Sequence, residues 1–259
     1  MDLITPIFVA VICALLGSFY NVVIFRLPQM KLEVGSPFIN LLKTLSSPRS
    51  YCDHCQTPLR VTMLCPIASY LAQKGKCKFC GEKIDPSNLL VEVITVVLGL
   101  IFYYSIENTF TSISLFIFFS AGVVLSVIDF KHHIIPDQIT LPLIWLGLLL
   151  NLFTGFVPLS DAVIGAMFGY LLLWTLYQVH YLLRKKEGLG YGDFKLLAAI
   201  GAWFGWQVLA IVLLLASVLA IIYFAISRKK SNQAIAFGPF IILGTFLVEA
   251  TPLRTILLW

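Results

Sequence analysis

The stretch from Ser114 to Asp129 reads SLFIFFSAGVVLSVID, an almost wholly apolar run that ends in a carboxylate. A helix of such residues suits the hydrocarbon core of a membrane, which takes about 20 residues to cross. A carboxylate at membrane depth is costly, so Asp129 needs a reason for its position. A second one, Asp193, follows two glycines in Gly190-Tyr191-Gly192-Asp193 and precedes another apolar run. The two carboxylates suggest a pair that shares a proton and performs acid/base chemistry.

The composition of the whole chain is that of a membrane protein. Of 259 residues, 59% are hydrophobic and only 12% are charged, which is more apolar surface than a soluble domain of this length can bury. The first apolar run, Ile4 to Phe25, is too long for the core of a signal peptide, and it lacks a basic start and a small-residue cleavage site. We therefore predict an all-α polytopic membrane protein whose first helix is permanent.

The apolar runs predict about eight transmembrane helices. Their approximate ranges are 4–25, 88–104, 111–129, 138–154, 161–183, 194–204, 206–227 and 237–257. The sixth is short for a span, and Gly201 and Gly205 near its end indicate a tilt, a break or a tight turn. Three parts follow from this pattern: residues 1–27 with the first helix, a cytoplasmic loop over 28–87, and a membrane core over 88–259 that carries both aspartates.

The basic residues predict the orientation of the chain in the lipid bilayer. The net charge is +5, but the basic residues cluster in short segments between the spans, as the positive-inside rule expects, so they do not indicate nucleic-acid binding. An N-terminus outside the cell leaves only Arg254 toward the outside. The other basic residues then lie at the cytoplasmic face: those from Arg26 to Lys83, Lys131, Arg184-Lys185-Lys186, Lys195 and Arg228-Lys229-Lys230.

The cytoplasmic loop contains two C-x-x-C pairs, Cys52 with Cys55 and Cys77 with Cys80, separated by 21 residues. This doubled pairing approximates a four-thiolate zinc knuckle, although the gap is slightly longer than usual. Four protein ligands leave no open position, so such a zinc ion is structural and helps to fold a loop that is too small to build its own core. Free cysteines or a redox pair are the alternatives. We interpret His54, Cys65 and Cys13 as bystanders.

Other acidic residues near the inner face have simpler interpretations. Asp137 precedes a predicted helix, where a carboxylate suits the helix dipole. Glu187 lies among basic residues and is typical of a solvated loop. Gly190 and Gly192 remove side chains beside Asp193, which allows a substrate chain to approach closely or the backbone to turn sharply. The pattern is not the dinucleotide-binding G-x-G-x-x-G, and no predicted strand precedes it, so we discount nucleotide binding.

The helix ends suggest unequal roles for the two aspartates. Asp193 lies near a helix N-terminus, whose dipole favours a negative charge, whereas Asp129 lies near a helix C-terminus, whose dipole disfavours one. We therefore hypothesise that Asp193 holds the charge and Asp129 the shared proton. The charged carboxylate would take a proton from water, which attacks a peptide carbonyl while the protonated partner donates to the carbonyl oxygen. The alternatives are a buried polar pair that joins two helices and a proton-coupled transporter.

Several motifs in one order carry a resemblance over nearly the whole length. They are Gly17-Ser18-Phe19-Tyr20-Asn21 through Arg26-Leu27-Pro28, the two C-x-x-C pairs, Ser69-Tyr70-Leu71, Leu90-Val91-Glu92, Asp129 with Ile135-Pro136-Asp137, Gly190-Tyr191-Gly192-Asp193-Phe194-Lys195 through Trp203, and Ala236-Phe237-Gly238-Pro239-Phe240. With these motifs the chain resembles the bacterial type IV prepilin leader peptidase and N-methyltransferase family. The Val61 to Ile67 segment and the residues before Glu92 depart from the usual family pattern.

The resemblance implies an aspartic endopeptidase of the bacterial inner membrane, with Asp129 and Asp193 as its catalytic dyad and Gly190, Gly192, Lys195 and Asp137 as supporting residues. It implies prepilin and pseudopilin substrates, cut after a Gly that ends a basic leader. It also implies N-methylation of the new N-terminus with S-adenosylmethionine, in the loop around Lys31 to Glu92. Another Gly-x-Gly-Asp membrane protease is the nearest alternative, and the cysteine loop argues against it.

Overall fold

The computed structural model describes residues 4–30, 44–47, 49–52, 54–185, 190–227 and 236–251. The chain divides into two compact units, Met1–Val124 and Leu125–Trp259. The described residues form helices, turns and isolated bridges but no strand, and a helix lies in each of the eight predicted ranges. The predicted all-α fold is therefore confirmed. The predicted division into residues 1–27, 28–87 and 88–259 stays a prediction.

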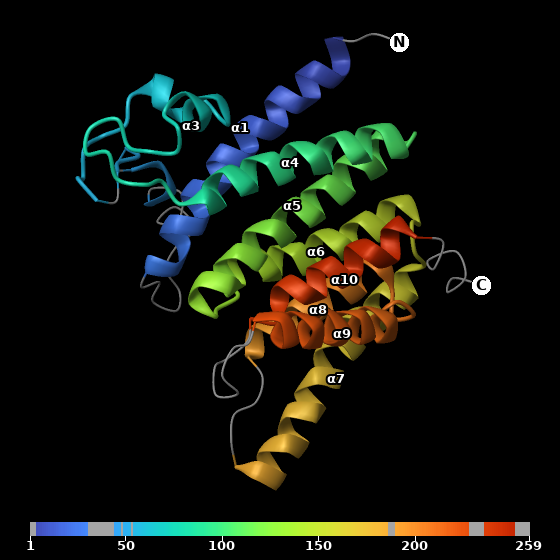
Figure 1. The fold of residues 1–259 in the computed structure, drawn as a ribbon. Coiled ribbons are helices and arrows are strands. Elements are labelled where there is room, and N and C mark those ends of the chain that lie inside the picture. The colour runs from blue at the N-terminus through green and yellow to red at the C-terminus, as the bar shows by residue number, and fades with distance from the viewer. Residues whose placement is uncertain are drawn as a thin grey trace. The chain divides into compact units, whose positions relative to one another are not determined.

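The first unit is built on a helix pair, α1 (Ile4–Arg26) and α4 (Pro86–Ser105), which lie side by side (Figure 1). Glycines permit this close approach, because a Cβ on Gly17 would lie 2.8 Å from the Glu92 backbone and one on Gly99 would collide with Cys13. The first part of α5 (Thr109–His132) completes the pair: the Phe119 ring stacks on Phe102, with centroids 5.6 Å apart.

The loop between α1 and α4 has little regular structure. Its described elements are η1 (Leu27–Gln29), η2 (Val61–Leu64) and α3 (Ala68–Ala72). Its prolines limit helix length, as the sequence predicts. Asp85 ends the loop by accepting a hydrogen bond from the Ser87 N–H at 2.9 Å, and Pro86 follows as the first residue of α4.

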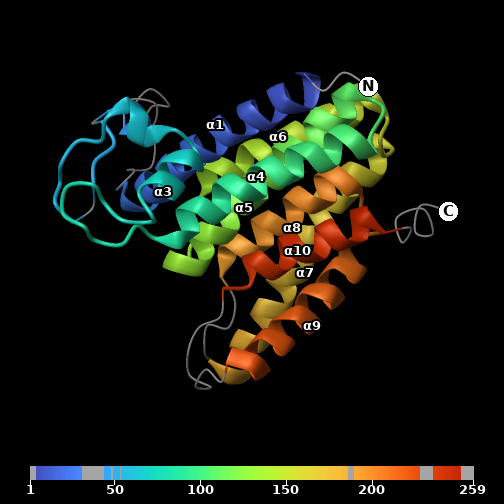
Figure 2. The same cartoon turned by 45° about the horizontal axis from the view of Figure 1, so that its top comes forward.

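The second unit comprises the end of α5 and five further helices. These are α6 (Asp137–Thr154), α7 (Leu159–Arg184), α8 (Tyr191–Phe204), α9 (Leu209–Ser227) and α10 (Gly238–Ala250). Helix α8 packs mainly against α7 and α6 and also contacts α9 and α10 (Figure 2). Gly165 on α7 meets the backbone of Gly201 on α8, which brings the two helices together.

Within the described part of the chain, six helices are long and apolar enough to cross a membrane: α1, α4, α5, α6, α7 and α9. The predicted helices 194–204 and 237–257 correspond to α8 and α10, which have 14 and 13 residues and are shorter than a span. From Asp193 to Phe204 every residue of α8 except Lys195 is buried. This helix faces protein, so it does not need the length of a lipid-facing span.

The other predicted ranges agree with the structure to within a few residues. Helix α8 ends at Gly205, whose φ of 82° breaks the helix and turns the chain toward α9. It also begins at Tyr191, so Asp193 lies inside the first helical turn and not before it. Several residues used for the predicted topology lie outside the described part of the chain: Lys31, Lys186, Glu187, Arg228-Lys229-Lys230 and Arg254.

Candidate active site and cysteine cluster

Asp129 and Asp193 lie together inside the second unit. Asp129 is near the end of α5 with 6% of its surface exposed, and Asp193 is in the first turn of α8 with 8% exposed. Ile135 lies against both Gly192, which precedes Asp193, and Gly238, which donates to Asp129, so the two carboxylates are near neighbours although they are far apart in the sequence. Two buried carboxylates this close cannot both ionise cheaply, which favours one shared proton.

The two carboxyl groups differ in their hydrogen bonds. The backbone N–H of Gly238, the first residue of α10, donates to Asp129 Oδ2 at 2.9 Å in a buried setting. The Oδ1 atom of Asp193 is buried without a hydrogen-bond partner among the described residues. An unpaired buried oxygen is costly, so this atom is the natural place for a proton or for an incoming polar group.

Ile135 fills the space beside two glycines near the aspartates. A Cβ on Gly192 would lie 2.6 Å from Ile135 Cβ, and one on Gly238 would lie 3.2 Å from Ile135 Cδ1. Gly192 is therefore required by the packing of Ile135, and its vacant side is not open to a substrate chain. Gly190 differs, because a Cβ there would meet only Asp193 Oδ2 at 3.6 Å, an ordinary contact.

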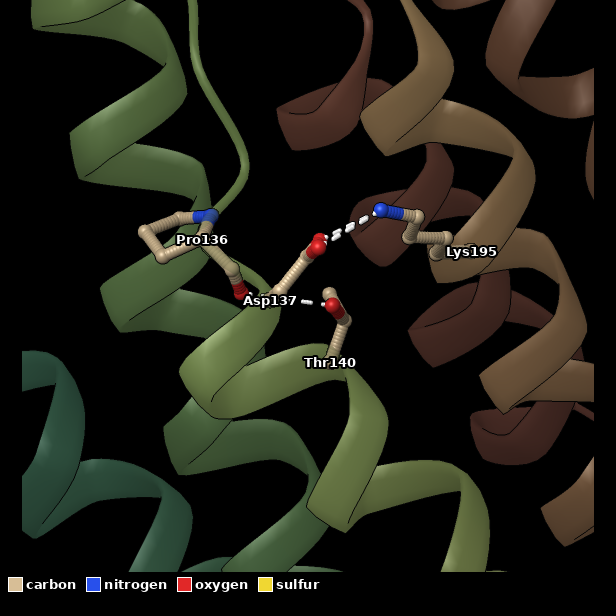
Figure 3. Close-up of polar contacts among 4 residues, drawn as sticks. All are labelled: Pro136, Asp137, Thr140 and Lys195. Atoms are coloured by element: carbon tan, nitrogen blue, oxygen red, sulfur yellow. Dashed lines mark hydrogen bonds and ion pairs between the residues drawn. The ribbon is translucent and has the colours of Figure 1, made fainter. Parts of the chain in front are cut away.

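Asp137 and Lys195 form an ion pair near the starts of α6 and α8 (Figure 3). Lys195 Nζ donates to both carboxylate oxygens of Asp137, at 2.6 and 2.7 Å. Lys195 follows Asp193 by two residues, so the pair ties the turn that carries Asp193 to the start of α6. Half of the Asp137 side chain is exposed, which keeps the energy of this pair small.

Gly238 and Ile135 are two residues of the site whose roles were not predicted from the sequence. Both residues belong to motifs that the sequence already singled out, Ala236-Phe237-Gly238-Pro239-Phe240 and Ile135-Pro136-Asp137. What the sequence lacks is the contact itself, because Gly238 is 109 positions from the carboxylate it binds. The expected charges of the two aspartates rested on the helices that carry them, and the N-terminus of α10 was not foreseen beside Asp129.

The four predicted cysteines of the loop converge on one point. The ligand atoms of Cys52, Cys55, Cys77 and Cys80 all lie within 4.8 Å of one another, and the Cys52 and Cys80 sulfurs are 3.9 Å apart. Sulfurs around a tetrahedral zinc ion, each about 2.3 Å from the metal, are about 3.8 Å apart. The cluster, which we call the cysteine cluster, is therefore compatible with zinc. Cys13, His54 and Cys65 are not part of it.

The cysteine cluster is built from two copies of one turn. In the first, the Gln56 N–H donates to the Cys52 carbonyl at 2.9 Å, and in the second the Gly81 N–H donates to the Cys77 carbonyl at 2.9 Å. Gln56 and Gly81 both have a positive φ, 57° and 73°. Hydrogen bonding by Thr57 lowers the pKa of the Cys55 thiol to about 6, which favours the thiolate that a metal requires.

A third buried carboxylate, Glu92, lies in the first unit near the start of α4. Its Oε2 accepts a hydrogen bond from the Ile67 N–H at 2.8 Å, and its Oε1 accepts one from Asn21 Nδ2 at 3.4 Å. Ile67 has a φ of 58°, a strained value for a β-branched residue. Glu92 thus ties a strained loop turn to the α1–α4 pair, and both of its oxygens are satisfied.

Comparison with known proteins places these features in a family. Residues 116–225 match the type IV leader peptidase family, and residues 11–106 match the bacterial peptidase A24 N-terminal domain. The chain is 40% identical over 250 residues to the prepilin leader peptidase/N-methyltransferase of Aeromonas salmonicida, covering 90% of this chain and 86% of that protein.

Two further relatives have the same description. The protein from Dichelobacter nodosus is 37% identical over 259 residues, covering 93% of this chain and 89% of its own length. The protein from Klebsiella pneumoniae is 45% identical over 201 residues, covering 78% and 86%. No solved structure matches the chain. The six apolar helices and these relatives make the chain a multi-pass inner-membrane protein, and it belongs to the type IV leader peptidase family.

Proposed function

We propose that this chain removes the basic leader of type IV prepilins and pseudopilins, cutting after a Gly, and then N-methylates the new N-terminal residue. Family membership supports both activities, since the relatives described above are prepilin leader peptidase/N-methyltransferases. The observation that carries the peptidase activity is the pair of buried carboxylates, Asp129 and Asp193, of which one keeps an oxygen without a hydrogen-bond partner among the described residues.

The two aspartates, which we call the dyad, would act as general base and general acid. The ionised carboxylate takes a proton from water, and the water oxygen attacks the carbonyl carbon of the scissile bond. The protonated carboxylate donates to the carbonyl oxygen, which gives a tetrahedral intermediate without a covalent bond to the protein. Burial keeps bulk water away and strengthens these electrostatic effects. A serine or cysteine nucleophile is not required.

The orientation that fits this chemistry has the N-terminus outside and the dyad at the cytoplasmic face. The basic residues support it by the positive-inside rule, with Lys131, Arg184, Lys185 and Lys195 near the ends of the helices that carry or adjoin the dyad. A prepilin has a basic leader followed by a long apolar helix. The leader would stay in the cytoplasm while the helix lies in the bilayer, so the bond between them falls at the inner interface.

The cysteine cluster would hold one structural zinc ion. Four converging sulfurs complete a tetrahedral site and leave no position for a substrate or a reactive water. Bound zinc would therefore supply no chemistry to the reaction and would stabilise the loop instead. S-adenosylmethionine would supply the methyl group for the second activity. We place that activity in the loop of residues 31–92, of which 31–43, 48 and 53 lie outside the described part of the chain.

The test is a reaction of the purified protein with a prepilin in detergent or lipid, followed by mass measurement of the product. We expect a product that begins after the Gly of the leader and that gains about 14 Da, one methyl group, only when S-adenosylmethionine is added. A product cut at another site, or an intact prepilin, would contradict the proposed peptidase. A correct cut without the added mass would contradict only the methylation.

A further inference from the structure

The first turn of α10 has one backbone N–H group that is not used within the helix, and this group faces Asp129. Pro239 has no N–H, and the N–H groups of Phe240 and Ile241 both donate to the Phe237 carbonyl, at 3.1 and 3.2 Å. The Gly238 N–H is the remaining donor of this turn, and it donates to Asp129 Oδ2 at 2.9 Å. The sequence Gly-Pro therefore leaves α10 with one donor at this end, directed at the carboxylate.

Position 238 also accepts no side chain. A Cβ there would lie 2.9 Å from Asp129 Oδ2 and 3.4 Å from Asp129 Cγ, so the carboxylate occupies the space that a side chain would need. Gly238 does not have a positive φ, so backbone conformation does not require glycine here. Close contact with Asp129 and Ile135 is thus the reason for glycine at this position.

The N-terminus of α10 opposes the electrostatic effect of α5 on Asp129. The C-terminus of α5 disfavours a negative charge on Asp129, but the N-terminus of a second helix, α10, now lies against the same carboxylate and favours one. Asp193 also has a backbone donor, Gly190, but its buried Oδ1 atom has no hydrogen-bond donor among the described residues. Two charged groups also influence the dyad: each aspartate lies near the other, and His133, which follows α5, lies near Asp129.

We propose that Gly238 is a positioning residue that makes Asp129 the charged member of the dyad and leaves the shared proton on Asp193 Oδ1. This inference rests on the proposed peptidase function. Asp129 then takes the proton of the attacking water, and Asp193 donates its proton to the carbonyl oxygen. When the tetrahedral intermediate collapses, the C–N bond breaks, the proton on Asp129 moves to the leaving amine, and Asp193 regains a proton from the re-forming carboxyl group.

The first experiment measures kcat, KM and the pH–rate profile of Gly238→Ala on a prepilin. The new Cβ displaces the Asp129 carboxylate from its donor, so we expect kcat to fall about 10- to 100-fold, as for the loss of a hydrogen bond to a charged group, with KM nearly unchanged. The acidic limb of the profile should move to higher pH, by about one unit, because Asp129 then accepts a proton more readily.

The matched control is Gly244→Ala on the same helix. A Cβ there would lie 3.0 Å from the Val212 carbonyl of α9, and neither aspartate is among its nearest atoms, so it disturbs the packing of α10 on α9. We expect it to lower Tm without moving the acidic limb of the profile. A limb that moves equally in both variants would assign the effect to general packing and overturn the proposal.

A second variant removes the donor without adding an atom. Glycolic acid, the hydroxy analogue of glycine, placed at position 238 by in vitro translation replaces the N–H by an ester oxygen. It should reproduce the fall in kcat and the shift of the acidic limb. If this variant keeps the kcat and profile of the unmodified protein while Asp129→Asn is inactive, the role of Gly238 is wrong and the peptidase stands. If Asp129→Asn also cleaves normally, the proposed peptidase itself is wrong.

Discussion

The cysteine cluster of the first unit and the dyad of the second both gather reactive side chains, but they differ in what is left unsatisfied. In the cysteine cluster four sulfurs lie within 4.8 Å of one another, an arrangement compatible with a tetrahedral metal, and each turn is closed by its own backbone hydrogen bonds. In the dyad, Asp129 has a donor from α10, whereas one oxygen of Asp193 has no partner among the described residues.

This difference separates structural from reactive sites. A site whose ligands complete one another gains stability and offers no position for a substrate. A buried oxygen without a donor lowers stability, and such a cost is typical of a site that completes its contacts only with its ligand. Glu92 supports the contrast within the first unit, since it is as buried as the dyad but both of its oxygens accept hydrogen bonds.

The largest effect on the surroundings of the dyad is expected for Gly192→Ala. The new Cβ meets Ile135 at 2.6 Å, so the first turn of α8 must move and carry Asp193 with it. We expect cleavage to fall about 100-fold, as for a displacement of about 1 Å in an active site. Adding Ile135→Gly should restore part of the activity, and a double variant no better than Gly192→Ala would contradict this packing argument.

The next effect is on the cysteine cluster. Cys77→Ser should abolish bound zinc, measured by metal analysis, and should lower Tm, because the loop loses its cross-link. Cleavage should fall by no more than about tenfold, since closed metal sites do no chemistry. The control is Cys65→Ser, which lies outside the cluster and should keep its metal. An unchanged metal content in Cys77→Ser would contradict the assignment of zinc to this cluster.

A smaller effect is expected for the ion pair of Asp137 and Lys195. Lys195→Met removes the charge but keeps much of the stem of the side chain. We expect a loss of less than about 1 kcal/mol in the free energy of unfolding, since the pair is partly exposed. Asp137→Asn should have the same effect, and the double variant should add nothing further. Fully additive losses would show that the two side chains are not coupled.

The smallest effect is expected for substitutions that exchange the positive-φ residues of the two turns in the cysteine cluster. Gln56 has a φ of 57° where the second turn has Gly81 at 73°. Gln56→Gly should stabilise the loop by up to about 1 kcal/mol, because glycine adopts this conformation without strain. The reciprocal variant, Gly81→Gln, should destabilise it by a similar amount. Resistance of the loop to a chelator, measured as the half-time of zinc loss, should rise in the first variant and fall in the second.

The sequence predicts more of the first region than of the second. The cysteine cluster is local: each pair spans four residues of one turn, and the doubled spacing alone indicates four ligands around one metal. The eight helices were also predictable, because apolar runs separated by polar or glycine-containing turns define them. Both aspartates were found for the same reason, since each adjoins such a run.

Contacts between distant parts of the chain were not predictable. The hydrogen-bond donor to Asp129 is 109 positions away, and the need for Gly192 depends on Ile135, a residue of another turn. The hypothesis that Asp193 holds the charge used the dipole of each residue's own helix, whereas our proposal adds the Gly238 donor of α10 and assigns the charge to Asp129. The short length of α8 was predicted, but that of α10 was not, because hydropathy does not distinguish a helix that faces lipid from one that faces protein.

Cleavage of a prepilin by Asp129→Asn and Asp193→Asn, in protein preparations with equal zinc content and equal Tm, tests the dyad most directly. Asparagine keeps the shape of aspartate but can neither take up nor release the proton. We expect the rate to fall at least about 100-fold in each variant, the contribution of a general acid or base, with zinc still bound. A rate near that of the unmodified protein in either variant would contradict the assignment of that aspartate to the reaction.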